Sequence, residues 1–131
     1  MFIFEPETVE ELEEKMLIPK GVYPFTVLNC KEKTSRSGNL MMVLTLEIFH
    51  ENGTIYRLID FLLATPEIMK FKLAKFCKYT GMEEKYSQGR LSDLDFNHRS
   101  GFLIIKHQIG KDDGVKRAVV GEYCDKSKAN I

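Results

Sequence analysis

Carboxylates are the first residues in this chain that could do chemistry, because two facing carboxylates can act as acid and base or hold a divalent metal. Adjacent acids occur at 83–84 and 112–113, both in turn-like sequence. Neighbours on a turn do not face one substrate from two sides, so we interpret both pairs as turn and solubility residues. Asp60 lies in the apolar run LIDFLL and could be joined by Glu47 from a neighbouring strand. We favour a structural role for Asp60, as a buried polar group with a partner, and keep a metal-dependent nuclease as an alternative.

Other catalytic patterns are missing from the sequence. The tripeptide Glu-x-Lys occurs only at 13–15 and 83–85, outside strand-like sequence, and neither GxxxxGK[ST] nor GxSxG is present. The cysteines and histidines are scattered without zinc-ligand spacing, at Cys30, Cys77, Cys124, His50, His98 and His107. We therefore predict no enzyme, no cofactor and no bound metal, and we interpret the cysteines as buried thiols in a reducing cytoplasm.

Basic residues give a clearer signal, which points to binding. The segment KTSRSGN at 33–39 separates two strand-like runs and is longer than an Asn-Gly hairpin turn needs to be. Its cations, hydroxyls and amide suit phosphate oxygens, and Gly38 lets the backbone bend or approach a ligand closely. The candidate residues in and beside this loop are Lys31, Lys33, Ser35, Arg36, Ser37 and Asn39. A second basic group surrounds the turn at 111–114 and comprises Lys106, Lys111, Lys116 and Arg117.

Aromatic residues could complete a nucleic-acid site, because each base that stacks on a ring contributes about 1–3 kcal/mol. The candidates in the first three strands are Tyr23, Phe25, Phe49, Tyr56 and Phe61. We prefer Phe49 and Tyr56 as the exposed pair, with Arg57 beside them, because the apolar residues at 44, 46 and 48 fill the opposite face. A slip of one residue in register would exchange the two faces.

The elements that must position these residues follow from the apolar patterns. Alternation predicts a first strand from Val22, with Tyr23, Phe25, Val27 and Asn29 on one face. A central strand at 40–50 and a third strand at 55–63 flank an Asn-Gly turn. Thr65-Pro66-Glu67 begins a helix that ends near Gly81. A long loop, with room for a short helical turn, spans 82–99, and strands at 101–110 and 115–124 form a second hairpin.

The order β-β-β-α-β-β predicts a mainly β fold with one capping helix, the five-stranded Greek-key barrel called the OB-fold. A small sandwich with an inserted helix is the alternative. Oligonucleotides bind such barrels on strands 2 and 3, between the loops that join strands 1–2 and 4–5. We divide the chain into an acidic, helical N-terminal extension at 1–18, a barrel domain at 19–124 and a flexible tail at 125–131.

Composition is that of a soluble globular domain, with 44% hydrophobic and 29% charged residues in 131. No apolar run is long enough to cross a bilayer, and we expect no signal peptide at residues 1–15. The formal net charge of zero hides an asymmetry, because residues 1–20 hold six acids and two bases. Residues 21–131 therefore hold 13 of the 19 acids and 17 of the 19 bases, a net of +4. We hypothesise that the acidic leader at 5–14 competes with nucleic acid for the basic groove.

Short motifs across residues 19–123 resemble a phage and prophage protein family long catalogued as a domain of unknown function. The matching positions are Pro19, Gly21, Tyr23, Ser37, Gly38, Asn39, Tyr79, Gly81 and Gly101. The resemblance implies an OB-fold protein that binds single-stranded DNA and is encoded beside recombination and replication genes. Many single-strand binders recruit partners through an acidic tail, but the tail DKSKANI, with one acid and two lysines, is not acidic.

We therefore expect a sequence-nonspecific single-stranded-DNA-binding protein that supports replication or recombination in the cytoplasm of a bacterial or phage-infected cell. Replication or recombination proteins and further copies of the chain are additional candidate partners, and we expect no membrane contact. A protein-interaction or assembly module on the same barrel is the first alternative, and the nuclease is the second.

Overall fold

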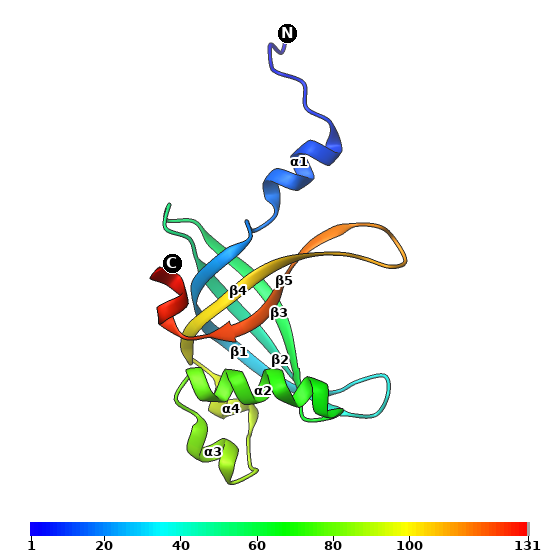
Figure 1. The fold of residues 1–131 in the computed structure, drawn as a ribbon. Helices are drawn as coiled ribbons and strands as arrows, with labels where there is room; N and C mark the ends of the chain where they lie inside the picture. Colours follow the sequence, from blue (N-terminus) through cyan, green and yellow to red (C-terminus); the bar gives the residue numbers. More distant parts are fainter. Residues whose placement is uncertain (131) are drawn as a thin grey trace.

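The computed structural model describes the backbone of residues 1–130 and the side chains of residues 1–128. Its elements are, in chain order, α1 (Val9–Met16), β1 (Gly21–Thr34), β2 (Leu40–Phe49), β3 (Ile55–Leu63), α2 (Glu67–Tyr79), α3 (Glu83–Ser87), α4 (Asp93–Phe96), β4 (Ser100–Ile109), β5 (Lys116–Cys124) and the 3₁₀ helix η1 (Lys126–Asn130). All five strands join one antiparallel sheet in the order β3-β2-β1-β4-β5 (Figure 1). The fold is therefore mainly β with a few helices.

The long strand β1 organises the sheet because it pairs with two neighbours. Residues 21–26 of β1 pair with β4, and residues 25–34 pair with β2. The sheet curls around this shared strand, so that β3 and β5, at the two ends of the strand order, both pack against α2 (Figure 1). Helix α2 thus covers one end of a closed core.

The core fills the inside of the curl. Its largest fully buried side chains include Phe25, Phe76, Phe96 and Tyr123, whose rings pack in tilted and edge-on pairs with centroids 4.9–6.0 Å apart. These rings come from β1, α2, α4 and β5, so one aromatic cluster joins both halves of the sheet to the helices. Such ring pairs add about 0.5–1.5 kcal/mol each beyond the burial of their area.

A buried ionic cluster ties the sheet ends to the helix. Asp60 on β3 is only 7% exposed and accepts hydrogen bonds from Tyr123 Oη at 2.6 Å and Lys72 Nζ at 2.7 Å. The Lys72 ammonium also donates to the carbonyl of Val120 on β5. Burial, and then the Asp60 carboxylate, hold the pKa of Tyr123 well above its usual value, so the phenol remains the donor. The expectation that Asp60 is a buried polar group with a partner is confirmed.

The chain outside the strands contains more short helices than the sequence predicted. Residues 82–99, predicted as a long loop with room for a short helical turn, contain the two short helices α3 and α4, and Ser92 and Asp95 form a capping box at the start of α4. The predicted tail contains η1, and Ile131 lies outside the described residues. No helix within residues 1–130 is both long and apolar enough to cross a membrane.

The cysteines lie inside the described fold, as expected. All three are free thiols in buried positions. Burial raises the pKa of Cys30 to about 12 and that of Cys77 to about 11, so both thiols stay protonated near neutral pH.

Candidate nucleic-acid interface

The outer face of β1, β2 and β3 carries the candidate interface, and a β-bulge determines which residues of β1 reach it. Val27 pairs with Leu46, but the next pair joins Asn29 to Thr45, so Leu28 is an extra residue. The prediction that Asn29 shares one face with Tyr23, Phe25 and Val27 is wrong, because this insertion reverses the alternation. The side chain of Asn29 is exposed, and that of Cys30 enters the core instead.

The bulge also turns Lys31 and Lys33 outward. The paired registers then place side chains in rows across the outer face, namely Thr26–Glu47–Arg57, Asn29–Thr45–Ile59, Lys31–Val43–Phe61 and Lys33–Met41–Leu63. Within these rows Ile59 is 57% exposed and Phe61 is 46% exposed. An apolar strip with an aromatic ring on β3 is therefore bordered by lysines on β1.

The predicted exposed pair of aromatics needs correction. Tyr56 pairs with Ile48 on the inner side of the sheet, is half-buried and packs against the core, whereas Phe49 lies on the outer side opposite Ile55 and is also half-buried. The exposed ring on this face is that of Phe61. Strand alternation could have revealed this, because a buried Asp60 forces Tyr56 inward and Phe61 outward.

The loop after β1 is shorter than predicted, because β1 continues to Thr34. Its polar side chains close the loop on itself: Ser35 Oγ accepts from the Asn39 backbone N–H at 3.1 Å and lies 3.0 Å from Ser37 Oγ. Gly38 has φ 86°, a left-handed conformation that side chains disfavour. Ser35, Ser37 and Asn39 thus shape the loop, and Arg36 is left exposed within it.

The second basic loop, between β4 and β5, is partly neutralised within the chain. Arg117 is paired with Asp113, whose pKa the guanidinium holds below its usual value, and Lys116 is paired with Glu14 of α1 at 3.0 Å. Lys111 is exposed in the turn. The Lys116–Glu14 pair is one contact of the kind expected if the acidic leader competes for the basic groove, although α1 otherwise projects away from the sheet (Figure 1).

Lys106 is exposed on β4, a strand outside the β1–β3 face and outside both basic loops. A Cβ at Gly121 would lie within 2.7 Å of its methylene carbons, so its stem lies over that glycine of β5. The exposed cations of the candidate interface that join none of the ion pairs among the described residues are Lys31, Lys33, Arg36, Arg57 and Lys111; we call them the interface cations.

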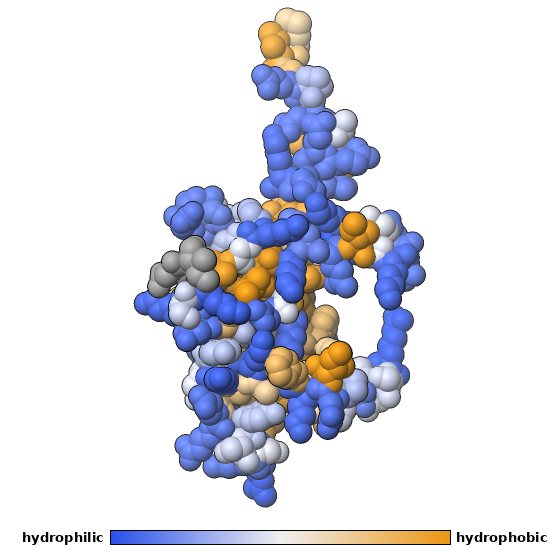
Figure 2. All heavy atoms as spheres, in the orientation of Figure 1, coloured by the Kyte–Doolittle hydropathy of each residue, from blue (hydrophilic) through white to orange (hydrophobic). Residues whose placement is uncertain are grey.

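The two hairpin loops project to the same side of the sheet, one above and one below β3 (Figure 1). The space-filling view shows the two loops extending beyond the body of the protein, mainly as hydrophilic surface with scattered apolar residues (Figure 2). Arg36 and Lys111 thus lie on two different loops, on either side of the strand that carries Phe61 as seen in Figure 1. Such an arrangement can hold phosphates at two borders and stack a base between them.

The structure does not bring Asp60 and Glu47 together. Asp60 points to the core, opposite Leu44, while Glu47 lies on the outer face opposite Arg57. They are on different sides of the sheet and cannot hold one metal ion, and no group of three potential ligands occurs among the described residues. A scan against protein-family models finds no match to the chain, and a search of curated proteins finds none either.

Proposed function

We propose that this chain is an OB-fold protein that binds single-stranded DNA without sequence preference. The connectivity supports the fold, because a sheet ordered β3-β2-β1-β4-β5 with a helix between β3 and β4 is what a five-stranded Greek-key barrel requires. The proposal also draws on the resemblance of short turn and strand motifs at residues 19–123 to the phage and prophage family.

The observation that carries the function is the row Lys31–Val43–Phe61 on the outer face of β1–β3. It combines a cation, an apolar surface and an exposed ring on the strands that oligonucleotide-binding barrels use. Phosphate oxygens would contact the interface cations, and a base would stack on Phe61. Contacts of this kind read no base edges, so binding would be nonspecific and would support replication or recombination in a bacterial or phage-infected cell.

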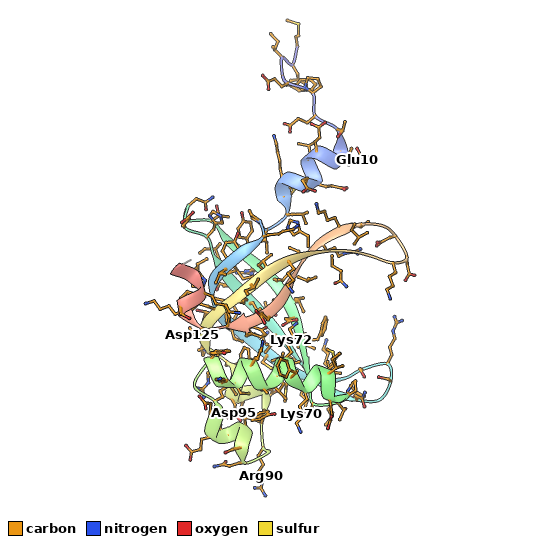
Figure 3. The ribbon with its side chains drawn as sticks, in the orientation of Figure 1. Glu10, Lys70, Lys72, Arg90, Asp95 and Asp125 are labelled. Atoms are coloured by element: carbon orange, nitrogen blue, oxygen red, sulfur yellow. The ribbon has the colours of Figure 1, made fainter. Side chains whose placement is uncertain are left out.

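The exposed apolar residues Ile59 and Phe61 could also bind a protein partner, so they are consistent with the alternative of a protein-interaction module. Fluorescence anisotropy with labelled oligo-dT and with duplex DNA of equal length separates the two. We expect the single strand to bind more tightly and Arg36→Glu to weaken it. The matched control is Arg90→Glu, because Arg90 is exposed beyond α3, at the end of the molecule away from the interface (Figure 3).

Lack of oligo-dT binding at low salt would contradict the proposal, as would equal losses in the two arginine variants. A stable protein complex without oligonucleotide binding would support the interaction module instead. Cleavage of the labelled DNA on addition of magnesium would revive the nuclease, in spite of the separation of Asp60 and Glu47.

A further inference from the structure

The N-terminal arm, residues 1–8, exposes the strongest apolar segment of the protein. Phe2 is 92% exposed, Ile3 is 88% exposed and Phe4 is 72% exposed, in a run that begins with Met1. The arm and α1 extend from the end of the barrel opposite to α2, α3 and α4 (Figure 1), and the arm's tip is apolar in the space-filling view (Figure 2). Consecutive exposed aromatic and aliphatic residues are uncommon on a free surface and mark a docking segment.

A cavity of suitable chemistry lies at the opposite end of the barrel. It has a volume of about 580 Å³ and is bounded by the start of β2, by α2 and by the segment from α3 to α4. Its apolar lining includes Leu40, Met41, Met42, Leu73, Tyr86 and Leu91. This volume is in the range of pockets that hold small ligands, and methionines adapt readily to an incoming apolar group.

Charge also matches the arm to this cavity. Lys70 lines it, is exposed, and joins none of the ion pairs among the described residues. It lies near the start of α2, on the side of the β1–β2 loop (Figure 3). In the arm, Glu5 directly follows Phe4, so an aromatic ring inside the cavity would leave a carboxylate near its mouth. Glu32 also lines the cavity and would repel that carboxylate unless it approached from the side of Lys70.

We propose that residues 1–5 of one copy dock in this cavity of a second copy, joining copies head to tail along a DNA strand, a proposal that rests on the single-stranded DNA binding proposed above. Arm and cavity lie at opposite ends of the molecule, so the contact is heterologous and can be repeated from copy to copy. A strand of DNA supplies the line along which such a repeat can grow.

The contact is expected to be weak between free molecules. Burial of three apolar side chains is opposed by the entropy lost when an extended arm becomes ordered. Two copies bound side by side on one strand are at millimolar effective concentration, which converts a weak contact into about 100-fold tighter binding per site. The inference therefore predicts a monomer in dilute solution and cooperative binding on long single strands.

The test compares the shortest oligo-dT that binds one copy with poly-dT that holds many copies, at the same salt concentration. For wild type we expect affinity per site to be about 100-fold higher on poly-dT. The variant Phe2→Ser/Phe4→Ser should lose most of that gain while binding the short oligonucleotide as wild type does. The control Ile68→Ser removes an apolar side chain that is 80% exposed on α2 outside the cavity, and it should change neither value.

Charge reversal sharpens the result. Lys70→Glu should reduce the cooperative gain, and adding Glu5→Lys to it should restore the gain. Equal affinity per site on short and long DNA in wild type would overturn the inference, as would full cooperativity in Phe2→Ser/Phe4→Ser. These results would leave the proposed function standing, because the short oligonucleotide still binds.

A measurement without DNA distinguishes failure of the docking inference from failure of the proposed DNA binding. Full-length Phe4→Cys is mixed with full-length Leu40→Cys at high protein concentration under mild oxidation, and disulfide-linked dimers are counted. The control pair is Phe4→Cys with Ile109→Cys, because Ile109 is exposed at the end of β4 outside the cavity. More dimer with Leu40→Cys supports docking even if no oligonucleotide binds, and equal yields overturn it.

Discussion

The salt dependence of DNA binding gives the sharpest prediction for the interface. Each phosphate contact on a single strand contributes about −0.7 to the slope of log K against log salt. With all the interface cations engaged, Z is about 5 and the slope is about −3.5, so affinity falls by about 130-fold between 50 and 200 mM salt. Replacing Lys31 and Lys33 by Gln lowers Z to about 3, which predicts a slope of about −2.1 and a fall of about 20-fold.

The assay is anisotropy of labelled oligo-dT over that salt range, with Arg90→Gln as the control that should retain the wild-type slope. A reciprocal change comes from Glu14→Gln, which releases Lys116 from its ion pair. If the acidic leader competes for the groove, this variant binds more tightly and its slope steepens to about −4.2. An unchanged slope in the Lys31/Lys33 variant would show that these lysines do not contact phosphate and would refute the placement of DNA on this face.

Four further outcomes follow from particular contacts. Asp60→Ala leaves an ammonium and a buried phenol without their partner, so urea melts should show a loss of about 3–5 kcal/mol, against about 1 kcal/mol for Tyr123→Phe; equal losses would count against the ionic cluster. Hydrogen bonds from Lys75 and Lys128 lower the pKa of Glu122 from 4.5 to about 2. The ionised Glu122 therefore contributes to the free energy of unfolding in full above pH 4.5, and this contribution is lost as the pH falls through 2. The stability of Glu122→Gln should therefore not show this loss between pH 4.5 and 2. If the variant loses stability over that range as wild type does, the ion pairs of Glu122 do not stabilise the fold. Gly38→Ala should cost about 1 kcal/mol in thermal melts through backbone strain alone, since nothing lies within 4 Å of the added carbon; an unchanged melting temperature would mean that the loop relaxes. Phe61→Ala should weaken oligo-dT binding by about 5- to 150-fold with the salt slope unchanged, and a loss that appears only in the slope would argue against stacking.

Much of the secondary structure was accessible from sequence, for reasons visible in single residues. The Asn-Gly turn at 52–53, the helix start at 65–67 and the apolar runs located β2, β3 and α2 to within a few residues. Gly38 was expected to permit a bend, and it adopts positive φ. Local signals of this kind depend on a few neighbouring residues, so they can be read without the fold. The short helices α3 and α4 lack such a period, and α4 forms where Phe96 enters the core.

The direction of the interface side chains was harder to predict. Asn29 was assigned to the same face as Tyr23, Phe25 and Val27, and Tyr56 was assigned to the exposed face, and both assignments were wrong. The first error arose because nothing in the local pattern announces the extra residue at Leu28. The second could have been avoided, because treating Asp60 as buried fixes the alternation of all of β3.

The sequence by itself indicated the order of the elements along the chain, the basic loop before β2 and the acidic leader, and it favoured Asp60 as a buried polar group, which the structure then showed with its partners Tyr123 and Lys72. Only the tertiary structure decided that Lys31 and Lys33 share a face with Phe61, and that Lys116 and Arg117 are already paired. The physical reason is that the order of elements along the chain depends on local turn and apolar signals, whereas the face of the sheet on which a side chain lies depends on the pairing register. A single inserted residue in β1 reverses every side chain beyond it, and that insertion is selected by how the whole sheet closes around its core.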